Sequence, residues 1–195
     1  MSLEEAMARR NARIENLRTL CAPIFASCGG KITLEIGCGK GHYLSAYASA
    51  FPGETCVGID LISERVRDGA RRAANRRAEN AHFVKAEASE FLESMPAGAR
   101  LERVFVFFPD PWPKAKHHRR RLMQPAFLDA LRPFCLPGAK LHFRTDCAEY
   151  FARTREIIAL NPNWRLCADN SLPLEEVSQF QRILPEFSTL AAEAV

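Results

Sequence analysis

Short apolar segments alternate with helical patterns along most of this chain of 195 residues, and this alternation constrains the fold more than any other feature. The strand-like segments are five or six residues long and rich in Ile, Val, Leu and Phe. They cover residues 32–36, 55–60, 81–86, 103–108, 140–145 and 164–168. Strands that alternate with helices are typical of a parallel sheet with helices on both faces. We therefore expect an α/β fold in one domain, with a mostly parallel, twisted sheet.

Composition and cysteine usage narrow the class of protein. The hydrophobic share of 47% and the charged share of 26% are those of a globular domain. Residues 3–20 have an imperfect helical stripe, so we expect an N-terminal helical extension over residues 1–30 and the sheet domain over 31–195. The seven cysteines are odd in number and none are spaced as C-x-x-C, which indicates free thiols in a reducing compartment. No apolar run has membrane-spanning length. We expect a cytoplasmic protein that binds neither a membrane nor a metal.

Acidic residues occur at the carboxyl ends of five successive strands. They are Glu35, Asp60, Glu87, Asp110 and Asp146. Right-handed crossovers bring these strand ends to one edge of a parallel sheet, where ligands of open α/β sheets bind. Any one of the acids alone is more simply a helix cap or a solvated side chain. Five acids at the equivalent position of five strands predict a negatively charged edge, which attracts a ligand that is cationic or rich in hydroxyl donors.

A glycine loop follows the first strand and restricts the ligand further. Its glycines are Gly37, Gly39 and Gly41. The dinucleotide pattern G-x-G-x-x-G is not met, because His42 stands where its third glycine belongs, and Glu35 would repel a pyrophosphate. Asp60 is placed to accept ribose hydroxyls. With an adenine near Glu87 and a positive amino-acid group near Glu35, these positions predict S-adenosylmethionine as the ligand.

The strand over 103–108 stops at three alternating prolines, because proline fixes φ and removes a backbone donor. Asp110 and Trp112 lie among the prolines, and Lys114 follows them. A basic run comes next: Lys116, His117, His118, Arg119, Arg120 and Arg121. We expect a rigid loop that presents a carboxylate and an indole beside a site for RNA phosphates. A solvated charged loop is the alternative, and Trp112 is either a stacking platform for a base or a hydrophobic plug.

Four motifs together resemble one family. The segments LEIGCGKG at 34–41, FPDPWPK at 108–114, HHRRR at 117–121 and LHFRTD at 141–146 are similar to those of the bacterial tRNA (guanine-N7-)-methyltransferases. The resemblance runs over about residues 31–160. It implies a Rossmann-like class I methyltransferase that transfers a methyl group from S-adenosylmethionine to N7 of a guanine in the variable loop of tRNA.

The same resemblance implies roles for particular residues. Cofactor-binding positions are Glu35, Gly37, Gly39, Gly41, Asp60, Glu87 and Asp110. Asp110 is the catalytic residue that it implies, and Lys114 and Asp146 are substrate-binding positions. The family's late segment that reaches the guanine is matched most nearly by Ser178 and Gln181. The chain ends soon afterwards, so we expect the family's last strand to be shortened or missing.

Other functions stay open at this point. One is a tRNA-binding relative with weak or lost activity, and another is a methyltransferase acting on a different RNA or on a small molecule. An NAD-dependent enzyme is disfavoured by Glu35 and His42. The sequence does not decide between a monomer and a homodimer.

Overall fold

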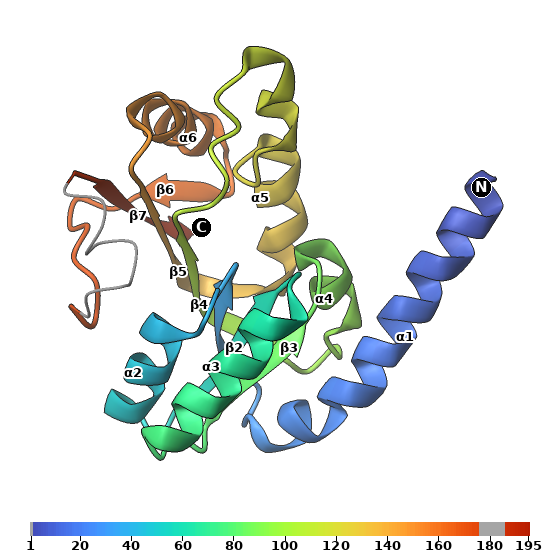
Figure 1. The fold of residues 1–195 in the computed structure, drawn as a ribbon. Helices are drawn as coiled ribbons and strands as arrows, with labels where there is room; N and C mark the ends of the chain where they lie inside the picture. Colours follow the sequence, from blue (N-terminus) through green and yellow to red (C-terminus); the bar gives the residue numbers. More distant parts are fainter. Residues whose placement is uncertain (1, 176–185) are drawn as a thin grey trace.

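A seven-stranded sheet between two layers of helices organises the protein (Figure 1). The computed structural model describes residues 2–175 and 186–195. The strands are β1 (Lys31–Ile36), β2 (Thr55–Asp60), β3 (Ala81–Lys85), β4 (Arg100–Phe107), β5 (Cys135–Thr145), β6 (Trp164–Leu166) and β7 (Ser188–Ala194). Their order is β3-β2-β1-β4-β5-β7-β6. The first five pair in parallel and β7 is antiparallel to both of its neighbours, which confirms the predicted α/β fold.

Within the described ranges, six α-helices and two short 3₁₀ helices accompany these strands. They are α1 (Leu3–Ser27), α2 (His42–Ala50), α3 (Ser63–Asn75), α4 (Ala88–Ser94), η1 (Ala115–Arg120), α5 (Pro125–Leu131), η2 (Arg132–Phe134) and α6 (Ala148–Leu160). On one face, α2 and α3 bury Tyr47 and Ala73 in a cluster with Phe105 of β4. The main core includes Phe91 of α4 and Leu128 of α5. Both faces of the sheet are thus covered, as the apolar character of the parallel strands requires.

Helix α1 packs against α4, and its N-terminal end extends away from the body of the domain (Figure 1). A capping box between Ser2 and Glu5 begins it, and it runs past the predicted end at residue 20 to Ser27. Arg10 pairs with Glu93 at 2.6 Å, and Arg13 pairs with the nearly buried Glu90 of α4. Across the described ranges, no helix is long and apolar enough to cross a membrane.

The carboxyl-terminal strand corrects one expectation from the sequence. We expected the last strand to be shortened or missing, but β7 pairs with β5 over six residue pairs, from Lys140 opposite Glu193 to Thr145 opposite Ser188. It also pairs with β6. Small residues such as Ala191 and Ala192 give this segment a weak strand signal, and its pairing partners supply the stability. Ser178 and Gln181 lie outside the described residues.

Candidate active site at the carboxyl edge of the sheet

A cavity of about 390 Å³ opens at the carboxyl ends of β1, β2 and β4. We call it the rim cavity. Its lining includes Gly37, Asp60, Glu87, Asp110, Trp112 and Arg120. Three of the five acids predicted to share an edge therefore meet in one cavity, and a fourth, Glu35, lies in β1 one residue before the lining residue Ile36. Asp146 and Lys114 are exposed, and neither lines this cavity.

The glycine turn after β1 has two parts with different physical roles. All three glycines have positive φ values, of 73°, 53° and 67° along the chain. A Cβ at Gly37 or Gly39 would meet no atom within 4 Å, so the backbone there is open to a ligand. A Cβ at Gly41 would lie 2.6 Å from the Phe83 ring and 2.8 Å from the Gly69 Cα. Gly41 is therefore required for the close approach of α2, α3 and β3.

Asp60 ends β2 and holds the glycine turn in place. Its carboxylate accepts hydrogen bonds from the backbone N–H of Gly39 at 3.1 Å and of Ile62 at 2.9 Å. The side chain is buried, and the guanidinium of Arg65 lies 3.7 Å away. An ionised carboxylate offers about four lone-pair sites, so two remain for hydroxyl donors of a ligand.

Glu35 is a buried acid with an unused oxygen. It is 4% exposed, and its Oε2 atom has no hydrogen-bond partner among the described residues. Burial raises the pKa of this carboxyl to about 8, although a backbone hydrogen bond at Leu44 opposes the shift, and the negative charge of Asp60 adds to it. A cationic or N–H-bearing ligand group would satisfy the unused oxygen and favour the ionised form.

Glu87 caps helix α4. Its carboxylate accepts hydrogen bonds from the backbone N–H of Ser89 at 2.9 Å and of Glu90 at 3.2 Å. This is the helix-cap role that any single acid after a strand can have. Glu87 also lines the rim cavity.

The proline loop after β4 is held in a strained conformation. Phe108 and Trp112 have φ values of 49° and 43°, which bulky residues rarely adopt, and they flank the exposed Asp110. The half-buried Trp112 ring has the Arg120 guanidinium 5.0 Å from its centroid. Both Trp112 and Arg120 line the cavity, so the indole is a wall of the site and not a plug buried in the core.

The basic run divides into exposed residues and one structural residue. Lys116, Arg119 and Arg120 are exposed on η1, and His117 and His118 are half-buried. Arg121, which we predicted to bind RNA, is only 4% exposed. It donates to the Pro111 carbonyl at 2.7 Å and to both oxygens of Glu149. Arg121 thus ties the proline loop to α6. No metal-binding group of three or more His, Cys, Asp or Glu side chains occurs within residues 2–175 and 186–195.

The sequence analysis missed two apolar residues at the cavity wall. Leu61 and Ile62 are 65% and 45% exposed, follow Asp60 directly, and line the rim cavity. Large apolar side chains left exposed beside a cavity are typical of a ligand-binding wall. Their place directly after an acid at the end of β2 is the signal that would have found them.

The strand order, the antiparallel β7, the glycine turn and the acid after β2 define a Rossmann-like methyltransferase fold. A solved 16S rRNA (adenine(1408)-N(1))-methyltransferase from Catenulisporales acidiphilia, a W203A mutant with its cosubstrate SAM, shares this fold with a TM-score of 0.60. The two chains are 22% identical, and the match covers 91% of each. Residues 30–194 match the Methyltransf_4 family, described as "Putative methyltransferase", and the chain belongs to this family.

Two curated relatives match most of the chain. A tRNA (guanine-N(7)-)-methyltransferase of Paraburkholderia xenovorans is 36% identical over 152 residues, which are 76% of this chain and 58% of the relative. One of Caulobacter vibrioides is 33% identical over 151 residues, which are 75% of this chain and 66% of the relative. The chain therefore spans less than two thirds of the length of these relatives.

Proposed function

We propose that this protein transfers the methyl group of S-adenosylmethionine to N7 of a guanine in the variable loop of tRNA. One observation carries the proposal. A single cavity is bounded on one side by the glycine turn and Asp60, and on the other by Asp110, Trp112 and Arg120 of the proline loop and η1. A small-molecule ligand and an RNA base could therefore meet in it. The names of the curated relatives support the same reaction.

The residues on the cofactor side fit S-adenosylmethionine. The free lone pairs of Asp60 suit the two ribose hydroxyls, and the unpartnered oxygen of Glu35 suits an ammonium group. The open positions at Gly37 and Gly39 let the backbone approach the ligand, and Ile62 offers an apolar contact to the adenine. When bound, this cofactor supplies an electrophilic methyl group on a positively charged sulfur.

The remaining chemistry needs alignment more than proton transfer. Guanine N7 carries an in-plane lone pair and no proton, so no general base is required. As the N–CH₃ bond forms, the S–CH₃ bond breaks and its electron pair stays on sulfur, while positive charge develops on the purine. The strained proline loop fixes Asp110 at the cavity mouth, where a carboxylate would stabilise that charge without taking a proton. Trp112 offers a ring against which the extruded base could stack.

Two basic segments flank the rim cavity and suit a polyanionic substrate. On one side, η1 exposes Lys116, Arg119 and Arg120. On the other side, residues 63–77 carry six arginines against two acidic residues, and Arg65 at the start of α3 lines the cavity itself. Contacts from both segments to phosphates would hold the RNA across the cavity and make its binding depend on salt.

The proposal is tested with labelled S-adenosylmethionine and a tRNA transcript. We expect label in N7-methylguanosine, recovered after nuclease digestion. A matched transcript with 7-deazaguanine in the variable loop has no nitrogen at that position and should accept no label. Free guanosine should be a poor acceptor. Equal labelling of both transcripts would refute N7 as the target. Tight tRNA binding without any label would identify a binding protein that has lost its activity.

A further inference from the structure

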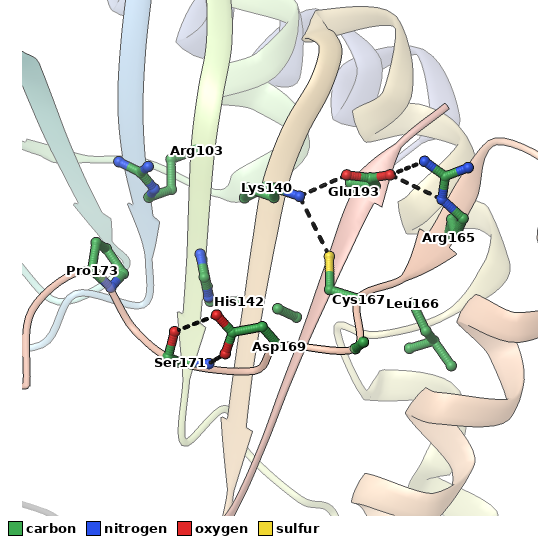
Figure 2. Close-up of a pocket in the computed structure, with 12 residues that line it drawn as sticks. Arg103, Lys140, His142, Arg165, Leu166, Cys167, Asp169, Ser171, Pro173 and Glu193 are labelled. Carbon is green, nitrogen blue, oxygen red and sulfur yellow. Dashed lines mark hydrogen bonds and ion pairs between the residues drawn. The ribbon is translucent and has the colours of Figure 1, made fainter.

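A second cavity, of about 500 Å³, is lined by strand side chains and by the segment after β6 (Figure 2). It lies on the face of the sheet that α2 partly covers, because Arg103 in its wall binds Tyr47 of α2. We call it the face cavity. It shares no lining residue with the rim cavity. Its wall includes Arg103 of β4, Lys140 and His142 of β5, and Glu193 of β7. The segment from Leu166 to Asp169 borders it. Helix α2 packs on Phe105 of β4. It does not cover the strand side chains farther along this face, and the cavity lies over them.

Strand register brings charged residues from four strands into one row. Arg103 is paired with Lys140, Lys140 with Glu193, and Glu193 with Arg165. The Nζ atom of Lys140 lies 2.6 Å from one oxygen of Glu193, and Arg165 binds the other oxygen (Figure 2). These two cations lower the pKa of Glu193 to about 2. One carboxylate of the row therefore serves two of its three cations, while the third, Arg103, pairs with Glu54 outside the row at 3.5 Å.

Two nitrogens in this wall have no hydrogen-bond partner among the residues that the structure describes. The Nε atom of Arg103 is buried and makes no hydrogen bond among the described residues. One terminal nitrogen of that guanidinium donates to the Tyr47 hydroxyl and lies 3.5 Å from a carboxylate oxygen of Glu54. His142 is 5% exposed, and its Nδ1 atom also lacks a partner within the described residues. A buried polar atom left unpaired destabilises the folded protein, so such atoms are usually satisfied by a ligand, a water or a protein group.

The hydrogen-bonding groups of the wall identify the ligand class. The acids are already engaged, since Glu193 accepts from Lys140 and Arg165, and Asp169 accepts from Ser171. The unused groups are N–H donors on cationic side chains and a buried imidazole. They call for an anion with several acceptor oxygens. A volume of about 500 Å³ is far larger than one oxyanion and falls within the range of small-molecule sites.

We propose that the face cavity is a second ligand site, which binds a phosphate ester through Arg103, Lys140 and His142. The phosphate oxygens accept hydrogen bonds from the two cationic side chains, and the organic part of the ester lies along the segment that follows β6. A free nucleoside monophosphate and a phosphodiester of bound RNA both carry this group. The inference stands independently of the methyl-transfer reaction proposed for the rim cavity.

The test uses a cysteine that the cavity itself provides. Cys167 is half-buried in the face cavity, with its Sγ atom 3.6 Å from Lys140 Nζ. Cys147, half-buried at the start of α6, is the internal control. Alkylation by iodoacetamide is followed at each cysteine by peptide mass spectrometry, with AMP, adenosine, inorganic phosphate or tRNA present. We expect millimolar AMP to slow alkylation of Cys167 at least fivefold and that of Cys147 by less than twofold.

The arms of the experiment separate the sources of the phosphate. Protection by AMP or inorganic phosphate supports a site for free phosphate compounds, and protection of Cys167 by tRNA alone assigns the phosphate to RNA. Equal protection by adenosine would overturn the proposal, because charge would then not matter. Absence of protection by all four probes would overturn it as well.

A pair of lysine variants checks the residues. Lys140→Gln should weaken AMP binding at least tenfold in calorimetric titration. If tRNA alone protects Cys167, the same variant should instead remove that protection. Lys140→Arg should keep most of the AMP binding or of the protection, because it keeps the positive charge. Lys31→Gln is the matched control, since Lys31 forms an exposed pair with Glu102 at 3.0 Å and lines neither cavity. Melting temperatures of the three variants show that each is folded. Unchanged binding and protection in Lys140→Gln would refute the assignment.

Discussion

The rim cavity takes most of its polar side chains from the ends of strands and the loops that follow them, whereas the face cavity takes its charged side chains mainly from the strands themselves. At the rim, parallel strands deliver acids to one edge; Arg65 lies 3.7 Å from Asp60 there, but Glu35 keeps an oxygen without a partner among the described residues. On the face, cross-strand register sets cations beside a carboxylate, and Arg103 keeps an unpartnered N–H. We therefore propose that the same sheet provides a site for a cationic ligand and a second site for an anionic one. Residues in the loops after strands can be exposed and can adopt strained backbone conformations, whereas charged residues opposite each other on neighbouring strands tend to form ion pairs.

Substitution of Asp110 tests whether methyl transfer takes place in the rim cavity and does not involve the face cavity. Asp110→Asn keeps the shape of the side chain but removes its charge, so it should lower turnover on tRNA by roughly 10²–10³-fold. Protection of Cys167 in the face cavity should not change. Steady-state kinetics with labelled cofactor measure the effect. Full turnover in this variant would show that another group stabilises the charge on the purine.

Asp60 tests the cofactor side of the rim cavity. Asp60→Ala removes the acceptor for ribose hydroxyls, at about 1.5–3 kcal/mol for each charge-assisted bond, and also frees the glycine turn at Gly39. We therefore expect a loss of at least tenfold in calorimetric cofactor affinity. Asp129→Ala is the matched control, because Asp129 binds Asn161 and lines neither cavity. An equal loss in the control would mean that the effect is one of folding.

Burial of Glu35 predicts that the stability of the protein depends on pH with a sign opposite to that given by an acid whose pKa is lowered in the folded state. The pKa of Glu35 in the folded protein, about 8, lies above the usual value of 4.5, so the folded state binds the extra proton between these values. Stability of the ligand-free protein should therefore fall as pH rises from about 5 to 8, by at most about 1.4 kcal/mol per pH unit from this group. Urea midpoints measured across this range should flatten in Glu35→Gln. An identical slope in parent and variant would contradict the buried, unpartnered state of Glu35.

The basic run gives the smallest effect and separates exposed from buried arginine. Replacing Lys116, Arg119 and Arg120 by alanine should reduce the log–log salt slope of tRNA binding by about 0.7–0.9 for each lost phosphate contact. Arg121→Ala should leave that slope unchanged. It should instead lower the free energy of unfolding by about 1–3 kcal/mol, because Arg121 binds Pro111 and Glu149. A reversed pattern would mean that Arg121 reaches the RNA in solution.

Much of the rim could be predicted from the sequence because its signals are local. The glycine turn, the acid after β2 and the proline stop after β4 each occupy a few consecutive residues, and Gly37, Asp60 and Asp110 do line one cavity. The structural roles of other residues could not be predicted from their neighbours in the sequence. Arg121 looks like its basic neighbours but is buried, and Gly41 looks like Gly37 but serves packing. Only long-range contacts distinguish the members of each pair.

The alternation of strands and helices follows from local patterns in the sequence, since the periods of 2 and 3.6 residues and the proline and glycine signals act over a few residues. Tertiary structure alone decided which strands became neighbours. It placed β7 between β5 and β6, and so brought residues 103, 140, 165 and 193 into one row. Register depends on contacts between segments far apart in the chain, where a slip of one residue would turn each of these side chains to the opposite face.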